Sequence, residues 1–195
     1  EKVGAQAISI LHPMFLSPND EELYSHFKTV ADSTSLPVLL YNNPDRMVCG
    51  ISTPLLERLA DVDNIVGIKE ATGDLQRGKQ ILETCGDQLD LYSGDDATAM
   101  ELILLGAKGD ISVTANVAPA AMHAMCRAAL AGDAATAAAL DADLAALHKA
   151  LFVESNPIPV KWALAHMGLI GEGIRLPLTW LSEGARPAVR EALAL

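Results

Sequence analysis

The sequence is poor in aromatic and basic residues and contains no long hydrophobic run. Aromatic residues make up 4% of its 195 positions. The chain has 14 Lys and Arg residues and 25 Asp and Glu residues, which gives a net charge of −11. Binding to nucleic acid requires a basic surface that neutralises phosphates. No apolar stretch approaches the roughly 20 residues needed to cross a bilayer. We therefore expect neither nucleic acid nor a membrane as a partner.

Cysteine is also scarce and unpatterned. The three cysteines, Cys49, Cys85 and Cys126, are odd in number and form no CxxC pair or Cys/His cluster, which argues against both a disulfide framework and a zinc site. The five histidines likewise lack the spacing of metal ligands. The cysteine usage favours a reducing, cytoplasmic setting.

Half of the residues are hydrophobic, and their pattern predicts alternating strands and helices. Apolar runs predict strands at 7–11, 36–41, 65–68, 89–93 and 109–113, and the segments between them have helical spacing and helix-start residues. This alternation is typical of βαβ units on a parallel sheet covered on both faces. From about Ala118 the chain reads as helical, with one interruption at 156–159, so a subdomain boundary is expected near Asn116.

In parallel α/β folds, functional residues collect where the strands end. Lys69 closes the apolar run 65–68, and lysine is rarely buried without a reason. Burial favours the neutral amine, a nucleophile suited to Schiff-base chemistry on a carbonyl. The alternative is a lysine that extends to solvent or pairs with Glu70.

Tyr41 and Arg46 follow the preceding predicted strand. The Tyr41 hydroxyl can donate and accept protons, although a packed ring with a solvated hydroxyl is the simpler interpretation. Arg46 is a candidate anchor for a substrate carboxylate, with a surface pair to Asp45 as the alternative.

Gly94 follows the predicted strand 89–93 and permits close approach of a ligand, or serves only as a tight turn. Asp95 and Asp96 are interpreted as caps of the next helix rather than as metal ligands. Taken together, these strand ends would bring an amine, a phenol, a guanidinium and the accessible backbone of a glycine to one end of the sheet. Such a set of groups suits imine formation with a 2-oxo acid.

Several segments carry a family resemblance over essentially the whole chain. They are LYNNPDR (40–46), GIKEATG (67–73), SGDD (93–96), ISVTANV (111–117), FVESNPIPVK (152–161) and LPL (176–178). With them the sequence resembles the family of dihydrodipicolinate synthases and N-acetylneuraminate lyases, which are class I Schiff-base (β/α)8 enzymes. The arginine and the 156–161 segment resemble the synthase branch.

The resemblance implies a role for each matching residue. Lys69 would form an imine with pyruvate, Tyr41 would relay protons, and Arg46 would bind the carboxylate of aspartate semialdehyde. Gly94 and Ile111 would line the pyruvate pocket. The expected product is 4-hydroxy-tetrahydrodipicolinate, on the route to lysine and diaminopimelate. The implied partners are these small molecules and further copies of the chain, in a dimer or tetramer, with no metal or organic cofactor.

The resemblance also implies how the chain is organised. A complete (β/α)8 barrel needs about 250 residues. Residues 1–117 would form the second half of the barrel, with the amino-terminal half absent, and 118–195 the barrel-closing helix and a C-terminal helical subdomain. We therefore expect a fragment of a longer enzyme, inactive by itself.

One segment departs from the synthase pattern. Where synthases usually show Thr-Pro-Tyr-Tyr, this chain has His12-Pro13-Met14-Phe15. Phe15 stands at the position of a relay tyrosine and cannot pass a proton, and Met14 replaces the tyrosine that contacts the inhibitor lysine. Two alternatives therefore stay open: a pyruvate-forming 2-keto-3-deoxy sugar acid aldolase or dehydratase of the same family, and a non-catalytic barrel fragment. Arg46 favours the synthase reaction.

Overall fold

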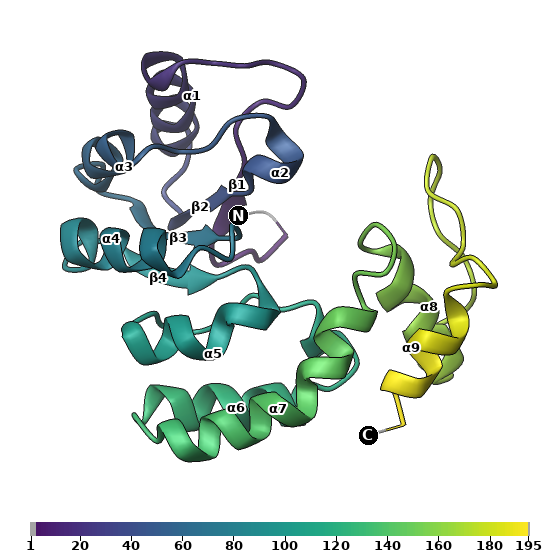
Figure 1. Ribbon diagram of the computed structural model, residues 1–195. Helices are drawn as coiled ribbons and strands as arrows, with labels where there is room; N and C mark the ends of the chain where they lie inside the picture. Colours follow the sequence, from purple (N-terminus) through teal and green to yellow (C-terminus); the bar gives the residue numbers. More distant parts are fainter. Residues whose placement is uncertain (1–2, 195) are drawn as a thin grey trace. The chain divides into compact units, whose positions relative to one another are not determined.

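The computed structural model describes residues 3–194, which fall into two compact units (Figure 1). The first unit extends to Ile111 and the second begins at Ser112, whereas the predicted boundary lay between residues 117 and 118. The barrel and subdomain roles assigned to the two ranges stay predictions.

The first unit is built on a parallel sheet with the strand order β1-β2-β3-β4. The strands are β1 (Ile8–Ile10), β2 (Val38–Asn42), β3 (Ile65–Glu70) and β4 (Asp90–Ser93). The helices are α1 (Asp20–Asp32), α2 (Pro44–Met47), α3 (Thr53–Ala60), α4 (Leu75–Cys85) and α5 (Asp96–Leu105). The predicted alternation of strand and helix is confirmed.

Local sequence explains where the helices begin. Asn19 and Glu22 form a capping box at the start of α1, in which each side chain binds the backbone of the other residue. Ser52 and Asp74 accept hydrogen bonds from first-turn N–H groups of α3 and α4. The apolar faces of the elements then meet in a core that fully buries Phe27, Leu40, Leu56 and Ile68.

The prediction of a strand at 109–113 is wrong. Asp110 makes one isolated parallel bridge to Ser93, supported by hydrogen bonds from Ser93 N–H to Gly109 O and from Ile111 N–H to Ser93 O, both 2.9 Å. A 3₁₀ turn, η1 (Thr114–Asn116), begins four residues after Asp110. The turn ends the extended conformation before a ladder can form.

The second unit is helical, as predicted, but not throughout. Its helices are α6 (Pro119–Leu130), α7 (Ala134–Ala150), α8 (Ile158–His166) and α9 (Arg186–Ala192). Leu147, Leu151, Ala163 and Val189 lie in the core that they share. The stretch 167–185 contains no helix, contrary to the predicted continuation. Positive φ angles at Gly168 and Gly173 explain the break, since L-residues in a helix have negative φ.

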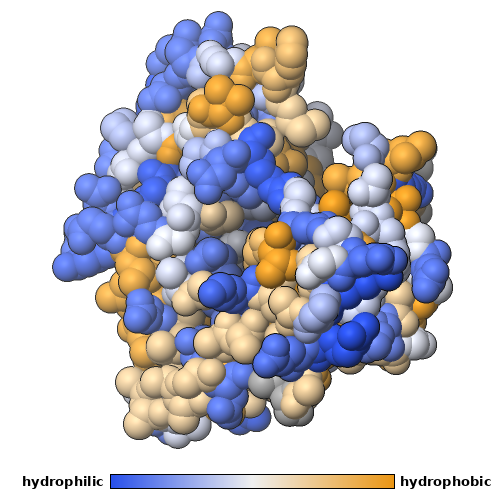
Figure 2. Space-filling model, turned by 45° about the vertical axis from the view of Figure 1, so that its right-hand side comes forward, coloured by the Kyte–Doolittle hydropathy of each residue, from blue (hydrophilic) through white to orange (hydrophobic). Residues whose placement is uncertain are grey.

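The face drawn in Figure 2 shows hydrophilic and hydrophobic side chains in interspersed groups. Within residues 3–194, no helix is both long and apolar enough to cross a membrane.

Candidate active site

Lys69 and Tyr41 are brought together at the carboxyl end of the sheet. They are directly paired in the register of β2 and β3, so their side chains project from the same face. The Lys69 Nζ lies over the Tyr41 ring, 4.4 Å from its centroid. Both residues are half-buried. The amine is therefore held against the phenol rather than extended into bulk solvent.

Asn43 orients the Tyr41 hydroxyl. Its Nδ2 donates a hydrogen bond to the Tyr41 Oη at 3.1 Å. With that lone pair engaged, the hydroxyl keeps its own hydrogen available for donation. This arrangement suits a group that donates and accepts protons.

Gly94 lies directly against the Lys69 side chain. A Cβ added at Gly94 would stand 2.7 Å from Lys69 Cε and 3.0 Å from Lys69 Cγ, well inside ordinary van der Waals contact. The Gly94 N–H also donates to Glu70 O at 2.8 Å. The glycine is therefore needed because the lysine passes through the space that a side chain would fill.

Ile111 joins this end of the sheet through its backbone. Its N–H donates to the carbonyl of Ser93, the residue that precedes Gly94. Its side chain is exposed. The backbone of Ile111 thus lies beside the Ser93–Gly94 segment, and its role in lining a pocket stays a prediction.

Arg46 is placed in α2, the short helix that begins two residues after β2 ends. The residue is exposed. Arg46 therefore lies in the connection that follows the Tyr41 strand, in a short helix rather than in the predicted loop, and its role as a carboxylate anchor stays a prediction.

An acidic pair beside Lys69 was not predicted. Burial raises the pKa of the Asp110 carboxyl to about 9, and a hydrogen bond with Asp96 together with the charges of Asp96 and Asp95 act in the same direction, while the charge of Lys69 opposes them. Asp110 is therefore protonated at neutral pH. The signal in the sequence that could have identified Asp110 was its position directly before Ile111, a residue already assigned to the pyruvate pocket.

Asp95 and Asp96 lie at the start of α5, as predicted. Asp95 occupies the N-cap position of α5 without capping it through its side chain. Its Oδ2 instead accepts a hydrogen bond from the Thr98 hydroxyl at 2.8 Å. Asp96, in the first turn of α5, is buried, where its negative charge complements the helix dipole.

The segment that departs from the family pattern is exposed at its tip. His12 is buried, and its Nε2 lies 2.8 Å from the Cys49 carbonyl oxygen. Phe15 is 98% exposed with a φ of 74°, and Met14 is also exposed. An aromatic side chain held in this strained conformation has no partner within residues 3–194.

Comparison with known proteins identifies the family. The model of the dihydrodipicolinate synthetase family matches residues 1–195. The chain belongs to this family.

Among curated relatives, the 4-hydroxy-tetrahydrodipicolinate synthase of Alcanivorax borkumensis is 58% identical over 190 residues, which are 97% of this chain and 65% of the relative. That of Pseudomonas aeruginosa is 56% identical with the same coverage. A crystal structure of dihydrodipicolinate synthase from Acinetobacter baumannii, complexed with pyruvate, shows 51% identity and a TM-score of 0.97, and the match covers 99% of this chain and 66% of that one.

These comparisons confirm the predicted family and fold class. The four βα units correspond to part of a (β/α)8 barrel. The chain spans about 65% of the length of the curated relatives it matches.

Proposed function

We propose that the protein condenses pyruvate with aspartate semialdehyde to 4-hydroxy-tetrahydrodipicolinate, through an imine on Lys69. The observation that carries the proposal is the Lys69 amine held 4.4 Å from the centre of the Tyr41 ring at the carboxyl end of a parallel sheet. The names of the curated relatives support the choice of reaction. The reaction serves lysine and diaminopimelate biosynthesis.

The proposed chemistry uses groups of the chain itself. The Lys69 amine adds to the C2 carbonyl of pyruvate, and loss of water gives the imine. Removal of a C3 proton gives an enamine, which attacks the aldehyde carbon of the semialdehyde. Tyr41, oriented by Asn43, moves protons during these steps. The amino group of the second substrate then displaces Lys69 as the ring closes.

The remaining assigned residues bind substrate in this proposal. The backbone of Gly94 and Ile111 lines the pyruvate pocket, and Arg46 binds the carboxylate of the semialdehyde through its fork of N–H donors. No metal or organic cofactor takes part.

Borohydride trapping tests the imine. The full-length gene product is incubated with pyruvate and borohydride, and peptide mass spectrometry locates the reduced adduct. We expect one adduct, on Lys69, its loss in Lys69→Ala, and its retention in Lys79→Ala, which removes an exposed lysine of α4. A chain that traps no pyruvate, or that carries the adduct on another lysine, contradicts the proposal.

Phe15 is the observation that favours a second candidate. A phenylalanine at the position of a relay tyrosine suits a pyruvate-forming aldolase or dehydratase that acts on 2-keto-3-deoxy sugar acids. The two reactions are separated by assaying pyruvate release from such acids beside a reductase-coupled condensation assay. Activity in neither assay, with no trapped imine, favours the non-catalytic alternative.

We also propose that the protein is a homo-oligomer. The exposed apolar residues Met14, Phe15 and Leu16 follow one another in one loop, and such groups mark interaction surfaces. Light scattering coupled to gel filtration measures the mass directly. A monomer at micromolar concentration contradicts this proposal.

A further inference from the structure

A closed polar network lies directly behind the proposed catalytic pair. The Glu70 carboxylate, 2% exposed, accepts hydrogen bonds from Asn42 Nδ2 at 2.8 and 3.1 Å and from Arg77 Nε at 2.7 Å. Arg77 Nη2 donates to the Ile51 carbonyl at 2.5 Å, and Ile51 N–H donates to Asn42 Oδ1 at 2.9 Å. Each member therefore bonds to its two neighbours around a ring.

The network joins the elements that carry the site. Asn42 ends β2, Glu70 ends β3, and Arg77 lies in the first turns of α4. Burying a carboxylate is unfavourable unless a cation and hydrogen bonds compensate it. Well-packed apolar side chains often stabilise a fold as much as a buried ion pair does, so such a pair is better explained by the geometry it specifies.

The geometry specified here is the register of β2 and β3. Asn42 pairs with Glu70 in the same ladder in which Tyr41 pairs with Lys69. Neighbouring residues of a strand face opposite sides of a sheet. The side-chain bond between Asn42 and Glu70 on one face thus fixes which residues stand opposite each other on the other face.

The backbone ladder alone fixes this register less firmly than a regular pair of strands does. The β2–β3 pairing is irregular between Val38 and Leu39, and an inserted residue locally disrupts the ladder. A slip by one residue would move Lys69 to the opposite face from Tyr41. The side-chain lock lies on the carboxyl side of the irregularity, where the register matters for the chemistry.

We propose that Glu70 is a positioning residue, whose buried carboxylate, held by Asn42 and Arg77, fixes the strand register that sets Lys69 against Tyr41. The proposal rests on the imine chemistry proposed above. Glu70 acts through Lys69 and does not touch substrate. Its removal therefore lowers the maximal rate of imine formation more than it changes the pyruvate concentration at half-maximal rate.

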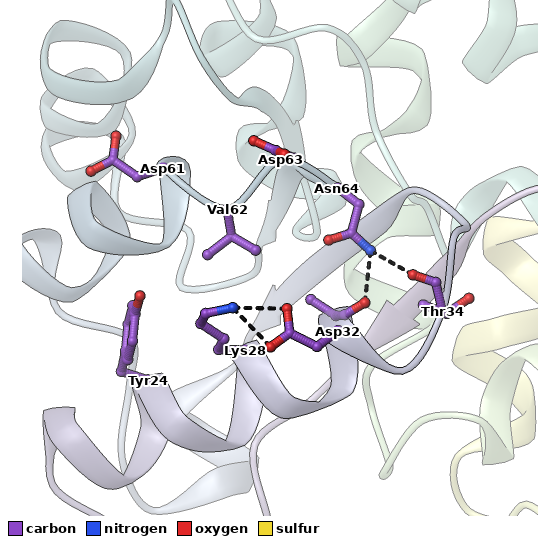
Figure 3. Close-up of a pocket in the computed structure, with 9 residues that line it drawn as sticks. Tyr24, Lys28, Asp32, Thr34, Asp61, Val62, Asp63 and Asn64 are labelled. Atoms are coloured by element: carbon purple, nitrogen blue, oxygen red, sulfur yellow. Dashed lines mark hydrogen bonds and ion pairs between the residues drawn. The ribbon is translucent and has the colours of Figure 1, made fainter.

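The test compares two asparagines at opposite ends of the β2–β3 pairing, Asn42 and Asn64, in the full-length gene product. Asn42→Leu breaks the hydrogen bonds that join Asn42 to Glu70 and to the Ile51 N–H, but leaves the Glu70–Arg77 ion pair. Asn64→Leu is the matched control, because Asn64 precedes β3 and its Nδ2 donates to Ala31 O at 2.9 Å and Thr34 O at 3.1 Å (Figure 3). That contact lies at the amino end of the strand, in a pocket remote from Lys69.

We expect Glu70→Gln and Asn42→Leu to slow trapping of pyruvate at saturation at least tenfold relative to Asn64→Leu, at a temperature at which thermal unfolding shows all three variants to be folded. Equal slowing in all three variants would show a general loss of stability and would overturn the proposal, as would trapping at the wild-type rate in Asn42→Leu. If Glu70→Gln does not fold, Asn42→Leu decides alone. Absence of trapping in the wild type refutes the proposed function instead.

Discussion

Replacing Gly94 by alanine adds one methyl group where the lysine passes the strand end. The new Cβ would lie 2.7 Å from Lys69 Cε and 2.7 Å from Ala71 Cβ, against an ordinary carbon–carbon separation of about 3.5–4.0 Å. Gly94 does not have a positive φ, so alanine is compatible with the backbone. The hydrogen bond to Glu70 O keeps the backbone from retreating, and Lys69 is therefore displaced by about 1 Å.

The expected losses in stability and in the rate of imine formation follow from this displacement of Lys69. Overpacking of this kind costs about 1–3 kcal/mol of stability. A misplacement of about 1 Å at a reacting group can cost up to roughly 100-fold in rate, so we expect imine formation to slow by about 10- to 100-fold. Stopped-flow or quenched trapping with pyruvate and borohydride measures the rate, and thermal unfolding measures the stability.

Gly184→Ala is the matched control for Gly94→Ala. A Cβ at Gly184 meets nothing within 4 Å, and Gly184 does not have a positive φ, so this variant should keep both rate and stability. If Gly94→Ala traps pyruvate as fast as the wild type, the close packing of Gly94 on Lys69 does not control the amine. If both glycine variants slow equally, the effect does not arise from the contact with Lys69.

Two further substitutions test other parts of the site. The folded state keeps a proton on Asp110 up to about pH 9, whereas the unfolded chain releases it near pH 4, so stability conferred by the protonated state is lost as the pH rises between these values. Asp110→Asn should remove this dependence of the free energy of unfolding on pH. In the wild type the loss accumulated by pH 7 is at most about 4 kcal/mol, at 1.36 kcal/mol per pH unit. Curves of stability against pH that run parallel for both proteins from pH 5 to pH 8 would contradict the assignment. Arg46→Ala removes a charged hydrogen-bond donor worth about 1.5–3 kcal/mol, so kcat/KM for aspartate semialdehyde should fall about 10- to 100-fold while pyruvate trapping is unchanged. Unaltered selectivity would exclude Arg46 as the carboxylate anchor.

The sequence by itself determined the fold class and the order of the elements. Buried parallel strands are apolar almost throughout, and the starts of α1, α3, α4 and α7 carry capping side chains, so both signals are local and are read directly from the chain. The same signals placed Tyr41, Lys69 and Gly94 at strand ends, because the ends of apolar runs are visible without knowing which strands pair.

Only the tertiary structure decided what surrounds those ends. The isolated bridge at Asp110 replaced a predicted strand because the length of a strand depends on the structure next to it, here the turn that begins at Thr114. Likewise, the lock between Asn42 and Glu70 depends on a register that joins residues 28 positions apart, and the protonated state of Asp110 depends on Asp96 and on burial. Pairing, burial and charge proximity are properties of contacts distant in sequence, and no local pattern encodes them.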